Sequence, residues 1–265
     1  MKITIIGCGA MGEAILKGWL KENINKDDLL IVQRSIERAN YLRETYVVEV
    51  VDDIALAHEA DVILIGVKPQ DIKVVLNELG KVIKPQTLVI SMAVGVTTSF
   101  ILEQLGTSNP VVRAMPNTPA LVQRGTTGLA AAPTCNLDYL NTAKELLETV
   151  GICVVVAEDL IDVVAAVSGS GPAYFFWLIE NLTNTAAALG LSKEVAELLV
   201  RETFIGSGIL LDQTNDSAEQ LRVKVTSPKG TTQAAIEVIE ASGASKLVYE
   251  ALSAAIARAH QLRQG

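Results

Sequence analysis

Hydrophobic and polar residues follow two different patterns along the chain. Up to residue 157, short runs of β-branched and other apolar residues alternate with stretches of helical periodicity. This alternation predicts right-handed strand–helix–strand units on a mainly parallel sheet. The first expected helix begins at Met11, and the others cover residues 35–46, 54–59, 70–82, 97–105 and 137–149. The expected strands are KITIIG, LLIVQR, VVEVV, DVILIGV, TLVISMA, VVRAM, TTGLAAA and GICVVVA.

From residue 158 onward, nearly every segment has helical periodicity or an alanine-rich composition. Two of these segments, 173–189 and 245–262, are apolar over much of their circumference. A helix that is apolar on all sides has to be buried, either in a bundle or against a second copy of the chain. We therefore expect two domains, 1–157 and 158–265, and a homodimer formed through the helical domain.

Charge and composition exclude several classes of protein. The 22 Lys and Arg residues against 30 Asp and Glu give a net charge of -8, which argues against a nucleic-acid-binding protein. Mean hydropathy is high at +0.35, but we expect no membrane span and no signal peptide, because the apolar runs are short. Three cysteines without metal or redox spacing predict reduced thiols, no metal site and a cytoplasmic protein. His58 and His260 lie far from any motif, and we expect both to be structural.

The motif GCGAMG follows the first predicted strand and precedes the first predicted helix. In that context Gly7 permits a tight turn, Gly9 lets the backbone approach a diphosphate, and Gly12 lets the helix pack closely on the strand. Ala10 and Met11 complete the motif. These five residues predict a dinucleotide-binding site.

Arg34 and Ser35 stand at the end of the second strand, where an NAD site carries an acidic residue. Because arginine can form paired hydrogen bonds with phosphate oxygens, NADPH is the expected cofactor, with NADH as the alternative. A solvated basic turn is the non-functional interpretation. Three later loops, GVKPQ, SMAVG and RAMPNTPA, end strands at the same edge of the sheet. We expect these loops to line the nicotinamide, because Pro69 and Pro116 fix their course and the small Ala93 lets a flat ring approach the backbone.

The segment VTSPKGTTQAAIE places a Ser-Pro pair before an amphipathic run. We expect a helix to begin beside Pro228, with Ser227 as its cap. The amides of Gly230, Thr231 and Thr232 would then lie at the positive end of the helix, where an anion can bind. An ordinary helix cap is the alternative.

Proton donors for carbonyl reduction are missing from the motifs. The chain has no Tyr-x-x-x-Lys pair, and neither histidine is near a motif. Reduction of a cyclic imine does not need such a dedicated proton donor, because the imine nitrogen is basic enough to take a proton from solvent or a hydroxyl. If the imine carried a carboxylate, the amides of 230–232 would hold it and the Thr232 hydroxyl would approach the nitrogen.

In the order GCGAMG, GVKP, RAMPNTPA, SGSGPAYFF and VTSPKGTTQ, the chain resembles the Δ1-pyrroline-5-carboxylate reductase family along nearly its whole length. The resemblance implies an α/β fold with an N-terminal Rossmann-type doubly wound sheet plus a C-terminal all-helical dimerisation domain, and in many members a ring of dimers. It also implies NAD(P)H-dependent reduction of 1-pyrroline-5-carboxylate to L-proline, the last step of proline biosynthesis. Carried over by motif, the substrate-binding residues are Ser227, Lys229, Gly230, Thr231 and Thr232, with Thr232 nearest the imine as the catalytic residue. The residues that would surround the nicotinamide half are Val67, Lys68, Pro69, Ala93, Met115, Pro116 and Asn117.

One position departs from the family pattern, which has two glycines after Ser-Pro where this chain has Lys229 and Gly230. If the first position requires a positive φ, Lys229 is strained by about 1–2 kcal/mol, and its charge could attract a carboxylate. A different cyclic imino acid is therefore an alternative substrate. A β-hydroxyacid dehydrogenase is a second alternative, although 173–180 lacks the lysine expected there. An NADP(H)-sensing regulatory protein is the non-enzymatic alternative.

Overall fold

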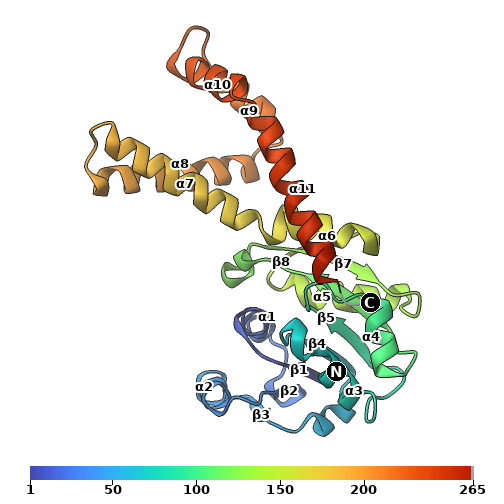
Figure 1. Cartoon of the computed structure of the whole chain (residues 1–265). Coiled ribbons are helices and arrows are strands. Elements are labelled where there is room, and N and C mark those ends of the chain that lie inside the picture. The colour runs from blue at the N-terminus through green and yellow to red at the C-terminus, as the bar shows by residue number, and fades with distance from the viewer. Residues whose placement is uncertain (264–265) are drawn as a thin grey trace. The chain divides into compact units, whose positions relative to one another are not determined.

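The computed structural model describes residues 1–263 and divides into two compact units (Figure 1). Unit 1 contains Met1–Ser170 and the C-terminal segment that starts at Ala255. Unit 2 contains Gly171–Ala254. The boundary expected at residue 157 falls at the end of the last strand, whereas the chain leaves unit 1 only after Ser170.

Unit 1 is built on an eight-stranded sheet in the order β3-β2-β1-β4-β5-β6-β7-β8. Neighbouring strands are parallel except for the antiparallel pair β6–β7. Each strand corresponds to one of the runs expected from the sequence, so the mainly parallel sheet is confirmed. The strands are β1 (Ile3–Ile6), β2 (Leu29–Val32), β3 (Glu49–Val51), β4 (Val62–Ile65), β5 (Leu88–Ser91), β6 (Val111–Met115), β7 (Gly125–Ala131) and β8 (Gly151–Val155).

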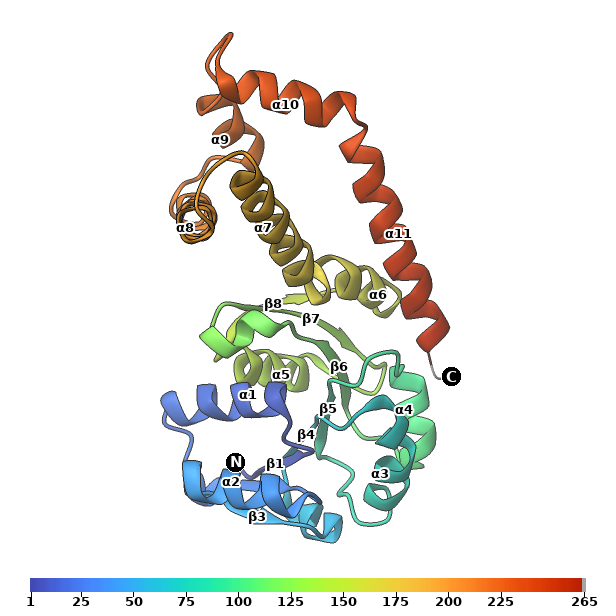
Figure 2. The ribbon, with the colours of Figure 1, turned by 60° about the vertical axis from the view of Figure 1, so that its left-hand side comes forward.

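Helices cover both faces of this sheet (Figure 2). Because successive strand residues point to opposite faces, Ile5 belongs to the core under α1, α2 and α5, and Ile6 to the core under α3 and α4. The helices of unit 1 are α1 (Ala10–Lys21), α2 (Ile36–Tyr46), α3 (Ile72–Leu79), α4 (Thr98–Leu105), α5 (Leu137–Glu148) and α6 (Ile161–Val164).

Short helical turns complete unit 1. The segment Ile54–Glu59, expected as an α-helix, is a 3₁₀ helix, since six residues between two strands are too few for a stable α-helix. The other 3₁₀ turns are Lys26–Asp28, Pro69–Asp71, Thr118–Val122 and Glu158–Leu160, and Ala165–Gly169 forms a turn of π-helix.

The sheet topology determines where a ligand can bind. The chain runs from β1 through β2 to β3 at one edge and then returns to β4 on the other side of β1. In open sheets of this kind, ligands bind outside the carboxyl ends of the strands at this switch point. The glycine-rich turn after β1, Arg34 after β2 and Lys68 after β4 all lie at that edge.

Unit 2 is helical throughout. It contains α7 (Gly171–Ala188), α8 (Lys193–Gln213), α9 (Ala218–Lys224), α10 (Thr231–Ala241) and the first part of α11 (Ala244–Leu262). Large apolar side chains are exposed in the single chain, among them Phe176 (65%), Trp177 (60%) and Tyr249 (73%). Apolar exposure on this scale is typical of a protein–protein interface.

One helical stretch, Glu158–Ala188, is long and apolar enough to cross a membrane when only length and composition are considered. The expectation that no run reaches this length was therefore wrong. The stretch is interrupted by the π turn, and helices that are buried in soluble proteins or assemblies pass the same test.

Candidate cofactor and substrate sites

The glycine-rich turn between β1 and α1 has the backbone that its motif predicts. Gly7 has a φ of +82°, and a Cβ there would lie 2.6 Å from Val67 Cγ1, so a side chain would be both strained and obstructed. A Cβ on Gly12 would lie 3.4 Å from the Gly7 carbonyl oxygen. A Cβ on Gly9 would meet nothing within 4 Å. The turn is therefore tightly packed at Gly7 and Gly12 and open at Gly9.

Helix α1 begins directly at this open position. Gly9 is its N-cap, and no side chain caps this end of the helix. The first helical amides have no acceptor within the helix, and the first that does is Glu13 N, which donates to the Gly9 carbonyl at 2.9 Å. The amides of Ala10 and Met11 are thus left at the positive end of the helix, where phosphate groups bind. These residues fit the diphosphate of a dinucleotide.

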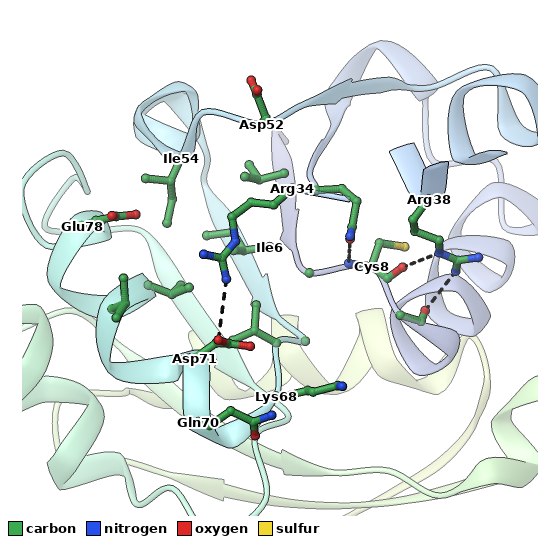
Figure 3. A pocket seen from close by; sticks show the side chains of 18 residues that line it. Ile6, Cys8, Arg34, Arg38, Asp52, Ile54, Lys68, Gln70, Asp71 and Glu78 are labelled. Carbon is green, nitrogen blue, oxygen red and sulfur yellow. Dashed lines mark hydrogen bonds and ion pairs between the residues drawn. The ribbon is translucent and has the colours of Figure 1, made fainter. Parts of the chain in front are cut away.

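A cavity of about 400 Å³ lies beside the turn (Figure 3). Its volume is typical of a small-molecule site. Five of the expected cofactor residues meet there, namely Gly7, Gly9, Arg34, Val67 and Lys68. The lining residues not expected as ligands are Ile6, Cys8, Val32, Gln33, Arg38, Asp52, Ile54, Gly66, Gln70, Asp71, Val74, Val75 and Glu78.

Arg34 and Ser35, both expected at the 2′-phosphate, have different environments. The exposed Arg34 side chain lines the cavity, and its Nη2 lies 3.8 Å from Asp71 Oδ1 (Figure 3). An exposed pair at this distance is weak, so the guanidinium is available to a second anion. Ser35 is the N-cap of α2, its hydroxyl accepts a hydrogen bond from Arg38 N at 3.4 Å, and it is not among the cavity residues.

Three carboxylates of the cavity, Asp52, Asp71 and Glu78, were missed by sequence reasoning. Asp52 follows β3 directly, and Asp71 ends the 3₁₀ turn that Pro69 begins. The rule that strand ends line the site, applied to β3, would have found Asp52. Asp71 carries no comparable signal, because its pairing with Arg34 depends on the fold.

Among the other expected nicotinamide residues, Pro69 begins the 3₁₀ turn after β4, and the rest follow or end β5 and β6; none of them lines this cavity. Ala93 is buried two residues after β5, and Met115 is the last residue of β6, followed by Pro116. The cavity thus brings the glycine-rich turn and Arg34 together with two of the expected nicotinamide residues, Val67 and Lys68. The residues of 93–117 are separate from it.

Asn117 joins three segments of unit 1. The side chain is 8% exposed, its Oδ1 accepts a hydrogen bond from Thr126 N at 2.8 Å, and its Nδ2 donates to the Ser168 carbonyl at 3.1 Å. Ser168 belongs to the π turn, in which a Cβ on Gly169 would lie 2.7 Å from Met115 Cε. The SGSGP segment is therefore packed against the end of β6, with Asn117 holding its backbone.

The expected substrate loop lies in unit 2, and its helix starts later than the sequence indicated. Helix α10 begins at Thr231 with Gly230 as its N-cap, so the expectation that Ser227 caps a helix starting at Pro228 was wrong. The reason is a turn that precedes the helix, in which Gly230 N donates to the Ser227 carbonyl at 3.0 Å. Lys229 has a φ of 61° in this turn. The condition for backbone strain at Lys229 is therefore met.

Two amides of this loop are already used. Lys229 N donates to Gln233 Oε1 at 2.7 Å, and Gly230 N is bonded within the turn. No side chain caps α10, which leaves the amides of Thr231 and Thr232 at its positive end. Within residues 1–263, the Thr232 hydroxyl has no hydrogen-bond partner in the structure. An anion at this end would therefore meet Thr231 and Thr232 rather than the Gly230 amide.

A buried ionic cluster joins the C-terminal end of α11 to the rest of unit 1. Asp162 is 1% exposed, and its Oδ1 accepts from Arg113 Nη2 at 3.1 Å. Its Oδ2 accepts from Arg263 Nε at 2.6 Å and lies 3.4 Å from His260 Nε2. Glu158 Oε1 lies 3.9 Å from Arg113 Nη1. No motif indicates this cluster, because its members are far apart in the chain.

The cysteines are free thiols. Burial raises the pKa of Cys8 to about 12, that of Cys153 to about 12 and that of Cys135 to about 11. None of them is activated as a nucleophile, since only the thiolate is reactive. Among residues 1–263, no group of His, Cys, Asp and Glu side chains could hold a metal ion.

Comparison with known proteins covers both parts of the chain. Residues 158–262 match the family model described as pyrroline-5-carboxylate reductase dimerisation. Residues 2–95 match the model described as NADP oxidoreductase, coenzyme F420-dependent. The pyrroline-5-carboxylate reductase of Corynebacterium melassecola is 38% identical over 264 residues, which is 98% of each chain. That of Pseudomonas aeruginosa is 37% identical over 265 residues, covering 99% of this chain and 97% of the relative.

Solved structures extend the likeness to three dimensions. A pyrroline-5-carboxylate reductase from Coxiella burnetii has a TM-score of 0.95 at 41% identity and covers 100% of this chain and 99% of its own. The pyrroline carboxylate reductase of Plasmodium falciparum with NADP bound has a TM-score of 0.86 at 27% identity, covering 100% and 98%. Together with the nearly complete coverage of the sequence relatives, this shows that the chain belongs to the pyrroline-5-carboxylate reductase family.

Proposed function

We propose that the protein is an NADPH-dependent pyrroline-5-carboxylate reductase, which reduces 1-pyrroline-5-carboxylate to L-proline in the last step of proline biosynthesis. The observation that carries the proposal is the similarity to reductases of this name over 98% of both chains. The uncapped start of α10 supports it, because such an end can bind an anionic substrate and the Thr231 and Thr232 amides are still available there.

The reaction adds a hydride to the imine carbon and a proton to the imine nitrogen. Bound NADPH supplies the hydride. The chain has to hold the substrate carboxylate and to donate a hydrogen bond to the nitrogen as it is protonated. We assign the carboxylate to the amides of Thr231 and Thr232 with Ser227 and Gly230 alongside, and the hydrogen bond to the Thr232 hydroxyl. Lys229 adds a positive charge to this loop.

For the cofactor, we assign the diphosphate to the turn of Gly7, Gly9, Ala10, Met11 and Gly12. Arg34 binds the 2′-phosphate in competition with Asp71, which lies 3.8 Å from it. NADH, which lacks this phosphate, is the weaker alternative. The nicotinamide half is assigned to the remaining strand-end residues, Val67, Lys68, Pro69, Ala93, Met115, Pro116 and Asn117.

We propose a homodimer formed by residues 158–262. The measured mass of the assembly decides whether dimers associate further into a ring. The segment matches a dimerisation model and carries exposed large apolar side chains. We assign the apolar stretch Glu158–Ala188 to this interface rather than to a membrane, and place the enzyme in the cytoplasm with no nucleic-acid partner. Light scattering after size-exclusion chromatography gives the assembly mass, and a monomer would contradict the proposal.

The activity is tested by NADPH oxidation with pyrroline-5-carboxylate, its six-membered piperideine analogue and a 2-keto acid. We expect rapid turnover of the five-membered imine only. Turnover of the analogue or the keto acid alone would mean that the loop containing Lys229 serves another substrate. NADPH binding without turnover of any of them would make the protein a cofactor-binding regulator.

The role of Thr232 is tested with Thr232→Ala beside the control Thr231→Ala, in which the backbone amide is kept. Loss of a hydrogen bond to a developing charge should lower kcat about 10–100-fold in Thr232→Ala. The Kd for NADPH should stay within about twofold in both variants, because the loop is assigned to the substrate. Equal losses of turnover and NADPH affinity would refute the role given to Thr232.

A further inference from the structure

Beside the cofactor cavity, Glu13 is the centre of a group of polar side chains that the assigned cofactor residues do not include. Its Oε1 accepts hydrogen bonds from Tyr46 and, at 3.0 Å, from Tyr41, and it lies 3.2 Å from Lys17 Nζ. Its Oε2 accepts from Arg38 Nη2 at 2.6 Å. We call these five residues the Glu13 cluster. It ties helix α1 to helix α2.

The carboxylate of this cluster is held in its ionised form. Burial by itself would raise the pKa of Glu13, but hydrogen bonds from Tyr46, Arg38, Lys17 and Tyr41 outweigh that effect and lower the pKa to about 2. Arg38 is accordingly paired with a full negative charge. Its guanidinium also lies over the Tyr41 ring, 5.0 Å from the ring centre.

From this anchored position, Arg38 reaches the glycine-rich turn (Figure 3). Its Nε donates to the Cys8 carbonyl at 2.9 Å, and its Nη2 lies 3.4 Å from the Gly9 carbonyl. In a trans peptide the C=O and N–H bonds point in opposite directions. The Cys8 carbonyl shares a peptide group with the Gly9 amide, and the Gly9 carbonyl shares one with the Ala10 amide. Because both carbonyls are directed toward Arg38, both amides point away from it.

We propose that Arg38 is a positioning residue, which orients the Gly9 and Ala10 amides for the cofactor diphosphate, while Arg34 alone determines the preference for the 2′-phosphate. Arg38 follows Arg34 by four residues in the sequence, and this spacing alone would allow both arginines to bind the phosphate. In the structure, however, Nε and Nη2 of Arg38 are directed to two carbonyls and a carboxylate, whereas the pair that Arg34 makes within residues 1–263 is the 3.8 Å one with Asp71. The inference rests on the proposed use of NADPH.

A binding experiment separates the two roles without measuring turnover. The Kd values of NADPH and NADH are obtained from nicotinamide fluorescence for wild type, Arg34→Ala and Arg38→Ala. Arg34→Ala should raise the Kd of NADPH about 10–100-fold and that of NADH less than about twofold, because only NADPH carries the 2′-phosphate. Arg38→Ala should weaken both by about the same factor, on the order of tenfold, because both carry the diphosphate.

Arg43 provides the matched control. It lies on the same helix α2, and its Nε and Nη2 donate to the Val50 carbonyl at 3.1 and 2.7 Å. Arg43→Ala therefore removes a comparable contact from an arginine to a backbone carbonyl, but away from the turn. Its Tm should fall while both Kd values stay within about twofold. This outcome separates orientation of the turn from a general loss of stability.

Glu13→Gln serves as a second variant if Arg38→Ala does not fold, since it keeps the size of the side chain and removes the charge that anchors Arg38. It should also weaken NADPH and NADH equally. A selective loss of NADPH affinity, with NADH affinity kept, in Arg38→Ala or Glu13→Gln would overturn the inference and make Arg38 a phosphate ligand. Unchanged Kd values in these folded variants would overturn it as well. If wild type binds neither cofactor, the proposed function fails together with the inference.

Discussion

Replacement of Asp162 by asparagine tests how strongly the buried ionic cluster stabilises unit 1. Asparagine has nearly the same size and keeps one acceptor oxygen, but it removes the negative charge shared by Arg113 and Arg263. Arg113 is 2% exposed and would then face only Glu158, whose nearest oxygen is 3.9 Å away. The substitution thus leaves a buried cation with a distant partner.

The magnitude follows from this geometry. Breaking a buried ion pair on one side costs about 3–5 kcal/mol, because the remaining charge stays buried without compensation. Since Glu158 offers Arg113 a partial substitute, we take the lower end, about 3 kcal/mol. In a domain of this size, 1 kcal/mol shifts Tm by about 2–4 °C. The expected decrease for Asp162→Asn is therefore about 6–12 °C.

Differential scanning calorimetry measures this shift, since it resolves separate transitions if the two units unfold independently. The control is Lys193→Gln, which breaks an exposed pair with Glu197 at 3.8 Å, where the side chains are 74% and 58% exposed. Such a pair contributes little, and Tm should change by less than about 2 °C. The double variant Asp162→Leu with Arg113→Met should recover most of the stability, because it removes both buried charges.

Two results would refute the reasoning. A Tm of Asp162→Asn within about 2 °C of wild type would mean that Arg113 is not dependent on this carboxylate. A double variant no more stable than Asp162→Asn would mean that the loss comes from packing rather than from an uncompensated charge.

Two further predictions concern Glu13 and Lys229. Because the folded-state pKa of Glu13 is about 2, below its ordinary 4.5, its ionised form stabilises the fold fully above about pH 4.5, and this contribution is lost as the pH falls toward 2. After allowance for solvent screening this contribution amounts to about 1–2 kcal/mol. In urea unfolding, the difference in unfolding free energy between wild type and Glu13→Gln should therefore shrink as the pH falls from about 5 to about 3, and a constant difference would contradict the reasoning. Lys229→Gly should raise Tm by about 1–4 °C, because the relief of left-handed strain exceeds the entropy that the glycine adds to the unfolded chain. The same substitution should raise KM for the imine if the lysine charge attracts its carboxylate. A lower Tm would contradict the strain inferred from the φ of 61°.

Features encoded by neighbouring residues could be predicted from the sequence. The eight strands were found because each is a short β-branched run between loops, and Gly7 because a tight turn between strand and helix requires a positive φ. The expectation that a positive φ would strain Lys229 depended on the same local logic. These features need no knowledge of distant parts of the chain.

Features that depend on a competing local turn or on side chains distant in sequence were not predicted. Ser-Pro suggested a helix start, but the bond from Gly230 N to the Ser227 carbonyl favours a turn and delays α10 to Thr231. Asn117 was expected at the nicotinamide, whereas its amide group also holds a π turn more than fifty residues away, at Ser168. Arg38 carries no sign in its neighbours that its donors are directed to the glycine-rich turn.

The Asp162 cluster means that the cofactor-binding half of the protein is encoded in two separate pieces. A fragment ending at residue 157 would keep all eight strands and every residue of the cavity. It would nevertheless lack Asp162 and Glu158, the carboxylates that face the buried Arg113, and Arg263, which also pairs with Asp162. Unit 2 is thus an insertion, and a minimal cofactor-binding module has to be made by joining Ser170 to Ala255 through a linker rather than by truncation.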